Sequence, residues 1–237
     1  MWQALHAELE PFGITVVTVA MDTVVDMATP WIDLAEPTHP SLIDTAHVTG
    51  DLFGFVNVPM AVWIDEHGTI VRPAELASLE PRVPREVPEG TPERIVEMMA
   101  EVNKLADVGA AYRAAVLDWA EHGAASRYAL RPDEVVARSQ PADADRARAA
   151  ACFELGQHLL HTVGHDAAVP WWREAHRLFP ENFTYKRQAW TLVTTPAGAD
   201  APDLIQGPND VYEGNWLDDV RAVGGGERYY PPSEFAP

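Results

Sequence analysis

The pattern of apolar residues at the start of the chain predicts a helix followed by a buried strand. Trp2, Leu5 and Leu9 recur at helical spacing. Pro11 predicts the end of that helix. The next segment, residues 14–21, is an almost unbroken run of β-branched and other apolar residues. Such a run is typical of a strand in a parallel sheet that is covered on both faces.

Shorter elements are expected over the following fifty residues. Gly54 predicts the end of a helix, because glycine is favoured just after a helical segment. Residues 66–68 have the composition of a hairpin turn. The predicted elements are, in order, a helix over 24–34 that Pro30 interrupts or bends, an extended piece over 41–44, a helix over 46–53, and the two strands of a hairpin over 60–65 and 69–71.

The second half of the chain is expected to be helical after a segment rich in proline. Prolines at positions 73, 81, 84, 88 and 92 predict a linker or a segment that wraps the surface between residues 72 and 92. Beyond it, Gly164 and Pro180 separate long helical patterns. Helices are predicted around residues 95–102 and 112–119 and over 143–163, 166–179 and 183–193.

Composition and charge limit the classes of partner. The chain has 237 residues, so one large or two small domains are expected, and its 47% hydrophobic content is enough for a real core. The formal net charge of -19 repels phosphate backbones and anionic lipid headgroups. Nucleic acid and membrane surfaces are therefore not expected as partners, whereas a protein or peptide partner is.

The single cysteine and the first residues of the chain indicate a compartment. Cys152 is the only cysteine and cannot form an internal disulfide. The chain begins without a basic cluster, carries Glu8 and Glu10, and has no apolar run of about 20 residues, the length that crosses a bilayer. A chain that starts at Met1 is therefore expected to be soluble and cytoplasmic, and a longer natural chain would leave the localisation open.

Three stretches of the first half carry a family resemblance. They are WQALHAELEPFGITVVTVAMD (residues 2–22), HPSLIDTAHVTGDLFGF (residues 39–55) and NVPMAVWIDEHGTIV (residues 57–71). Together they resemble the thioredoxin-like fold, and within it the thiol-disulfide oxidoreductases of the TlpA/ResA type. The resemblance implies an α/β thioredoxin-like domain with a mixed sheet and flanking helices. It also implies thiol-disulfide oxidoreduction as the ancestral function.

The Val58–Pro59 pair occupies the position of the family's substrate-contacting turn. In such proteins the proline is cis, and a cis bond is far less costly before proline than before any other residue. The resemblance implies that the backbone of Val58 pairs with a substrate strand, so Val58 and Pro59 are the candidate substrate-binding residues. The alternative is that Pro59 merely begins an edge strand.

The chain departs from the family where the chemistry lies, because it contains no CxxC pair. In the family, a strand precedes the helix that carries the CxxC pair, and it lies between the strands matching 14–21 and 60–65. This sequence lacks that strand. Without it, these two strands would pair directly or leave unpaired backbone groups. One hypothesis is that the natural chain begins upstream and carries the cysteines. The other is that this chain is redox-inactive and serves as a non-catalytic protein-binding module.

Residues 151–182 resemble one tetratricopeptide repeat. The resemblance is carried by Leu155, Gly156, Ala168, Ala175 and Pro180. Such repeats bury their apolar faces against neighbours, and at least three are usually needed for stability. A helical hairpin packed on the rest of the protein is therefore favoured over an array. The interaction hypothesis predicts an exposed groove, with Trp171, Trp172 and Trp190 as candidate partner-binding residues.

Other candidate sites are weaker. His158, His161 and His165 have the spacing of metal ligands, but Gly164 is expected to end the helix before His165. Cys152 is more simply a small buried apolar residue than a nucleophile. Asp65 and His67 are expected to be turn residues, and Asp218 and Asp219 a solvated surface. No catalytic residue, metal ligand or cofactor is therefore assigned.

The sequence thus predicts an α/β thioredoxin-like domain followed by an all-α domain. The expected boundaries are 1–80 for the first domain, 81–92 for a proline-rich linker, 93–195 for the helical domain and 196–237 for an acidic tail rich in proline and glycine.

Overall fold

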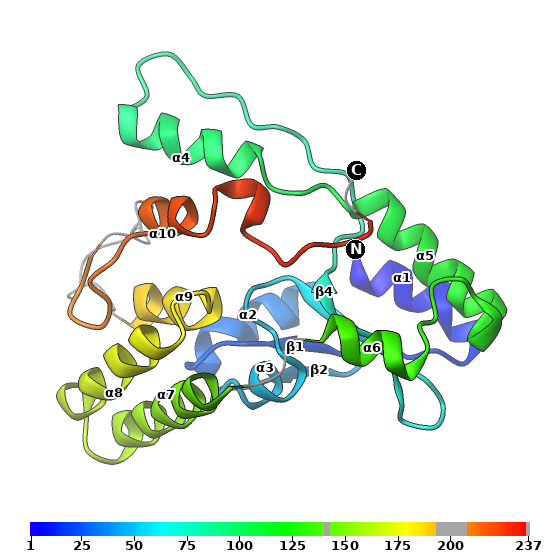
Figure 1. Cartoon of the computed structure of the whole chain (residues 1–237), viewed down its shortest axis with the longest axis horizontal. Helices are drawn as coiled ribbons and strands as arrows, with labels where there is room; N and C mark the ends of the chain where they lie inside the picture. Colours follow the sequence, from blue (N-terminus) through cyan, green and yellow to red (C-terminus); the bar gives the residue numbers. More distant parts are fainter. Residues whose placement is uncertain (140–142, 193–207, 236–237) are drawn as a thin grey trace. The chain divides into compact units, whose positions relative to one another are not determined.

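The computed structural model describes residues 1–139, 143–192 and 208–235, and its elements are labelled in Figure 1. The chain divides into two compact units. The first contains residues 1–81 and 108–143, and the second contains residues 82–107 and 144–237. The chain therefore passes from the first unit to the second, returns, and passes over again.

The strands of the first unit form two separate sheets. Strand β1 (Thr18–Ala20) pairs in parallel with β2 (Ser41–Ile43), with Thr18 opposite Ser41. Strand β3 (Met60–Ile64) pairs antiparallel with β4 (Ile70–Leu76). In the described part of the chain each sheet has two strands, and β1 does not pair with β3.

The predicted fold class, a thioredoxin-like domain with a mixed sheet, is wrong. Helices account for 53% of the chain, and the strands remain in two sheets of two strands each. A mixed sheet requires the parallel and antiparallel pairs to share a hydrogen-bonded strand, and here none joins them. The apolar run 14–21 accordingly contributes only three residues to a strand, because β1 has a ladder partner on one side alone.

The described part of the first unit also contains five α-helices. The core of the unit contains Leu5, Leu9, Trp63, Tyr112 and Val116, all buried. Helices α1 and α5 lie side by side, and Arg113 of α5 donates a hydrogen bond of 2.6 Å to Glu8 of α1. The helices are α1 (Trp2–Leu9), α2 (Val25–Ala35), α3 (Val48–Phe53), α5 (Gly109–His122) and α6 (Pro132–Arg138).

The second strand of the hairpin is longer than predicted. The sequence predicts a strand that ends at residue 71 and, from residue 72, a linker or a segment that wraps the surface, but residues 72–76 belong to β4. The pairing register shifts between Trp63 opposite Arg72 and Ala61 opposite Glu75, so Pro73 lies where the ladder is irregular. A bulge tolerates proline because no ladder donor is needed there. The strand therefore passes Pro73 without ending.

Local signals for helix ends agree with the structure. Gly54 follows α3 with φ 77°, as predicted for a left-handed C-cap. Gly164 separates α7 (Ala144–Thr162) from α8 (His165–Leu178), which confirms the predicted break before His165. Pro30 lies inside α2, and the segment stays helical on both sides of it.

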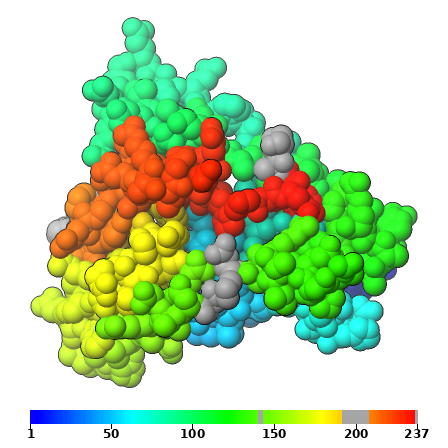
Figure 2. All heavy atoms as spheres, viewed as in Figure 1, coloured from blue at the N-terminus to red at the C-terminus, as the bar shows by residue number. Residues whose placement is uncertain are grey.

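The second unit consists of helices. Its α4 (Glu93–Asn103), α9 (Phe183–Leu192) and α10 (Trp216–Ala222) share one apolar cluster. Helices α7 and α8 pack against each other as a hairpin, and α9 contacts α8, so that their atoms form one continuous body in the space-filling view (Figure 2). The cluster comprises Met98, Phe183, Trp216, Leu217, Val220 and Tyr229.

The helical region 93–195 is shared between the units. Helix α4 and helices α7 to α9 belong to the second unit, whereas α5 and α6 belong to the first. The predicted boundary at residue 195 lies outside the described residues. The segment expected to be an acidic tail contains α10, whose apolar residues are buried in the second unit.

Close packing of the α7–α8 hairpin depends on Gly156. A Cβ atom at this position would lie 2.4 Å from Nε1 of Trp172, a fully buried ring. We expect Gly156→Ala to lower the free energy of unfolding by about 1–3 kcal/mol, the usual cost of overpacking. Urea denaturation measures this change. Glu154→Ala, at an exposed position of the same helix, is the control, and stabilisation by Gly156→Ala would contradict the packing argument.

Candidate functional site

The predicted substrate turn lies at the start of β3. The Val58–Pro59 peptide bond is cis, which confirms the sequence prediction. The buried Asn57 side chain accepts a hydrogen bond of 2.9 Å from the amide of Val58, and the carbonyl of Pro59 accepts one of 3.2 Å from the amide of Ala77. Val58 is half-buried and Pro59 is exposed. The turn is therefore fixed by its own backbone contacts and has one accessible residue.

Polar side chains before α3 hold the chain where it enters the helix. The Asp44 carboxylate accepts hydrogen bonds from the amides of Val48, at 3.1 Å, and Thr49, at 2.7 Å. Burial raises the pKa of Asp44, but the hydrogen bonds from Thr49 and Val48 outweigh it and bring the pKa below its ordinary value. His47 is buried with φ 60°, and burial lowers its pKa to about 4. These groups stabilise a turn and stay inside the fold.

Helix α2 presents an apolar face to solvent. Met27, Trp31 and Leu34 are 49%, 72% and 76% exposed. Their spacings of four and three residues place them along one side of the helix. Ala28 is the only buried residue that this helix contributes. The helix therefore directs its largest apolar side chains away from the core of its own unit.

An acidic row runs beside this apolar face. Asp26 and Asp33 are seven residues apart, which places them on one line along the helix, next to the stripe of Met27, Trp31 and Leu34. Glu36 follows the last turn of α2. Among the residues that the structure describes, no ion pair involves these three carboxylates. The apolar stripe of α2 and the acidic row beside it are therefore exposed on the same helix.

The sequence segment that contains α2 is acidic. Residues 1–71 contain no lysine or arginine, and the first basic side chain of those two types is Arg72. The lack of lysine and arginine and the spacing of Met27, Trp31 and Leu34 are visible in the sequence, but the exposure of these three side chains is not. The acidic residues of this segment are Glu8, Glu10, Asp22, Asp26, Asp33, Glu36, Asp44, Asp51, Asp65 and Glu66.

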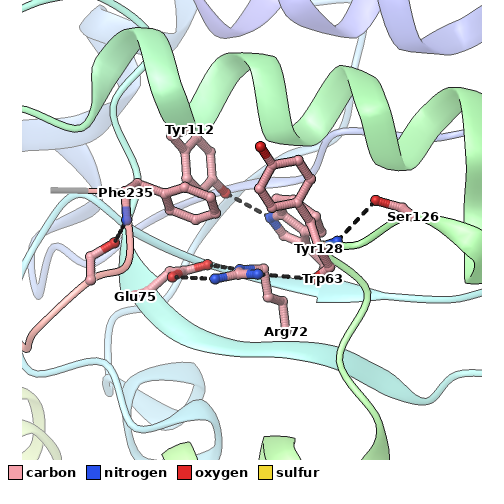
Figure 3. A network of polar contacts seen from close by, with 8 residues as sticks. Trp63, Arg72, Glu75, Tyr112, Ser126, Tyr128 and Phe235 are labelled. Atoms are coloured by element: carbon pink, nitrogen blue, oxygen red, sulfur yellow. Dashed lines mark hydrogen bonds and ion pairs between the residues drawn. The ribbon is translucent and has the colours of Figure 1, made fainter. Parts of the chain in front are cut away.

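A buried polar network joins the hairpin to α5 (Figure 3). Arg72, 1% exposed, makes a two-point ion pair with Glu75, in which Nη2 lies 3.2 Å from Oε2. The guanidinium also donates to the carbonyl of Tyr128 at 2.9 Å and lies 5.3 Å from the Trp63 ring centroid. Trp63 Nε1 donates to the hydroxyl of Tyr112 at 2.9 Å. Arg72, Glu75, Trp63 and Tyr112 are buried and Tyr128 is half-buried, so these contacts hold the hairpin, α5 and the segment before α6 together.

The three candidate tryptophans have different surroundings. Trp172 is fully buried in the α7–α8 hairpin. Trp190 is partly buried and packs against the apolar cluster of the second unit. Trp171 alone is exposed, at 40%. Since a shared groove needs more than one exposed ring, the structure does not bring these three residues together on one surface.

The remaining candidates have structural roles. In the described residues, no group of three or more His, Cys, Asp or Glu side chains is arranged to hold a metal ion. Cys152 is buried, and desolvation raises the pKa of its thiol. Asp65 accepts hydrogen bonds from the amides of His67, at 2.9 Å, and Thr69, at 2.8 Å, as expected for a turn residue.

Asp219 corrects one prediction from sequence. It was assigned to a solvated acidic surface, but its carboxylate lies 3.3 Å from the ammonium of the buried Lys186 and accepts a hydrogen bond of 2.7 Å from Tyr212. Burial lowers the pKa of Lys186, and the charge of Asp219 opposes that shift. Asp218, its neighbour, is exposed, and its backbone amide donates a hydrogen bond of 3.0 Å to the side chain of Asn215, the N-cap of α10. Adjacent residues in one helix therefore differ because one side of α10 packs inward.

A shallow hollow lies between α1 and α5. It measures about 210 Å³ and is lined by Leu5, Leu79 and Arg113, among others. The Arg113 guanidinium is already paired with Glu8. The Arg113 side chain therefore serves the contact between α1 and α5.

Comparison with models of known families, with curated proteins and with solved structures found no match for this chain. The family resemblance drawn from the sequence therefore stays a prediction. Within the described residues, no helix combines the length and the apolar character needed to cross a bilayer. The exposed apolar face of α2, with its acidic border, is a feature of the first unit that its core does not explain.

Proposed function

We propose that this chain is a non-catalytic protein-binding module whose first unit holds a segment of a partner protein on α2. The observation that carries the proposal is the exposure of Met27, Trp31 and Leu34 on one side of that helix. Contiguous exposed apolar surface of this kind marks interaction sites in folded proteins. A helix that turns its large apolar residues outward gains stability when another apolar surface covers them.

The chemistry of the face suits protein recognition. Trp31 offers a large flat ring with an N–H donor, and tryptophan is enriched among the residues that dominate binding energy at interfaces. Met27 adds a flexible apolar surface that adapts to different partners. Leu34 extends the apolar stripe by one further turn. The arrangement fits the recognition mode in which an apolar segment lies along an exposed helix.

Thiol-disulfide exchange, the function implied by the family resemblance, is supported less well by the residues present. The exchange needs a thiolate that attacks a disulfide sulfur. Cys152 is the only cysteine of this sequence, it is buried, and its pKa is raised by desolvation. Both conditions disfavour the thiolate at neutral pH. Binding without redox chemistry therefore accords better with this chain.

A peptide selection tests the proposed function without assuming the charge of the partner. A library of random peptides displayed on phage is selected on the immobilised full chain, and the enriched clones are then tested on Trp31→Ala and Leu34→Ala. We expect clones that bind the wild type and lose at least tenfold in affinity on either variant, because the apolar face supplies the contact. Trp171→Ala, which removes an exposed tryptophan of the second unit, is the matched control.

Two results would contradict the proposal. One is a selection that enriches no clone above background. The other is enriched clones whose binding is unchanged by Trp31→Ala but lost with Trp171→Ala, which would move the binding surface to the second unit. Trp31 is 72% exposed, so its replacement is expected to change stability by no more than about 0.5 kcal/mol. Far-ultraviolet circular dichroism checks that each variant remains folded.

A further inference from the structure

Helix α2 carries two features that point to the same kind of partner. One is the apolar stripe of Met27, Trp31 and Leu34. The other is the parallel row of Asp26 and Asp33, continued by Glu36 at the end of the helix. From their combination we infer that the bound segment is basic and amphipathic, with apolar side chains along one side and lysine or arginine beside them. This inference rests on the proposed binding role of α2.

Charge complementarity selects this partner. Asp26, Asp33 and Glu36 take part in no ion pair among the described residues. The segment 1–71 has no lysine or arginine of its own to neutralise them. A partner with cations beside its apolar residues therefore gains electrostatic attraction at the border of the interface, which raises the association rate and fixes the register.

The geometry of the helix sets the spacing on the partner. Asp26 and Asp33 are two helical turns apart, a rise of about 10 Å at 1.5 Å per residue. Cations that meet both carboxylates must be separated by a similar distance. Residues seven apart in a partner helix satisfy this, as do residues about three apart in an extended strand. Trp31 lies between the two carboxylates in sequence, where its ring can also accept a cation over its face.

The same charges disfavour the other occupants of an apolar face. A second copy of this chain would bring an equally acidic surface against α2, because residues 1–71 of each copy lack lysine and arginine. Like charges placed opposite each other cost several kcal/mol at an interface. An anionic lipid surface is repelled for the same reason. A basic protein segment is the occupant that both features attract.

Synthetic peptides test the inference directly. Three labelled peptides of equal length are titrated with the full chain: one with a leucine face bordered by lysine, one with the same leucine face bordered by glutamate, and one with the same lysines but serine in place of leucine. Fluorescence anisotropy measures each affinity at low and at physiological salt. We expect the leucine and lysine peptide to bind at least tenfold more tightly than either of the others.

Variants of the protein separate specific from diffuse attraction. The double variant Asp26→Asn with Asp33→Asn is expected to bind the leucine and lysine peptide at least fivefold more weakly at low salt and to show a smaller salt dependence. The double variant Glu86→Gln with Glu89→Gln removes an equal amount of negative charge from an exposed segment of the second unit. It is expected to leave the affinity within twofold, whereas equal losses in both double variants would show that only the net charge acts.

Other outcomes overturn the inference in recognisable ways. Equal affinities for the glutamate-bordered and the lysine-bordered peptides would contradict the preference for a basic partner. If the chain binds neutral phosphatidylcholine vesicles but no peptide, and Trp31→Ala abolishes that binding, the face is assigned to a lipid surface. A dimer that sedimentation detects and Trp31→Ala abolishes would assign it to a second copy. If the phage selection yields Trp31-dependent clones that lack lysine and arginine, the binding module stands and only its preference for basic segments fails.

Discussion

Replacing Arg72 by alanine is expected to lower the free energy of unfolding of the first unit by about 3–5 kcal/mol. The side chain is 1% exposed and neutralises the buried carboxylate of Glu75. Its loss leaves that carboxylate uncompensated and also deprives the carbonyl of Tyr128 of its donor. The expected loss is large because an unpaired charge in the interior has neither water nor a counterion.

Urea denaturation followed by tryptophan fluorescence measures the effect, since Trp63 lies over the guanidinium. Arg131→Ala is the matched control. Its ion pair with Asp133 has an N···O distance of 2.8 Å, but the two side chains are 72% and 70% exposed, and such solvent-exposed pairs contribute little to stability. Equal effects of the two substitutions would show that burial does not determine the value of the Arg72 pair.

A second variant tests the mechanism of that loss. Arg72→Met combined with Glu75→Leu removes both charges and keeps most of the volume. We expect the double variant to be more stable than Arg72→Ala alone, because no uncompensated charge remains. A double variant as unstable as the single one would indicate that the hydrogen bond to Tyr128 and the packing on Trp63, rather than the buried charge, carry the effect.

Acid is expected to destabilise the protein between pH 6.5 and about pH 4 through two buried histidines, one in each unit. Burial lowers the pKa of His47 and of His176 from 6.5 to about 4. In this window the unfolded chain binds a proton at each position that the folded chain does not, so the free energy of unfolding falls as the pH falls. The full effect is about 3 kcal/mol for each histidine, at about 1.4 kcal/mol for each pH unit.

The neighbours of each histidine modify this shift without reversing it. The carboxylate of Asp44 and the backbone of Met21 raise the pKa of His47, against the larger effect of burial. At His176 the backbone of Tyr185 and Val211 raises the pKa, while the charge of Lys186 lowers it further. The pKa of the Asp44 carboxyl is itself lowered by its hydrogen bonds, so its charge is lost only below this range.

Urea denaturation at a series of pH values measures the slope. We expect His47→Gln and His176→Gln each to flatten the dependence of the unfolding free energy on pH between 6.5 and 4, whatever their effect on stability at neutral pH. His161→Gln, at an exposed position, is the control and should leave the slope unchanged. A wild-type protein whose stability is constant over this range would refute the assignment of neutral buried imidazoles.

Local signals in the sequence predicted local structure well. Gly54 and Gly164 marked helix ends and Asp65 marked a hairpin turn, whereas the cis bond before Pro59 was expected from the family resemblance of its flanking residues. Each of these depends on the backbone preferences of one residue or on a hydrogen bond to an amide a few positions away. Such interactions form within a short segment, so a short segment of sequence is enough to indicate them.

The pairing of strands and the burial of charges could not be predicted in this way. The apolar runs at 14–21 and 60–65 predicted strands, but not which strands would pair with them. Pairing depends on the strands that fold alongside, and here the two runs lie in separate sheets. Arg72 stood in a segment interpreted as a linker, and Asp219 in a pair interpreted as surface. Each became buried because residues distant in sequence, Tyr128 for one and Lys186 for the other, pack against it.

The sequence by itself therefore determined the helix ends, the hairpin turn, the cis bond before Pro59 and the excess of acidic side chains, all of which depend on composition or on neighbouring residues. The tertiary structure alone decided which apolar residues face the core. The spacing of Met27, Trp31 and Leu34 shows that they share one side of α2, but whether that side is buried depends on what packs against it. In this fold the core takes Ala28 and leaves the larger residues in solvent, which is why the candidate binding surface emerged only from the structure.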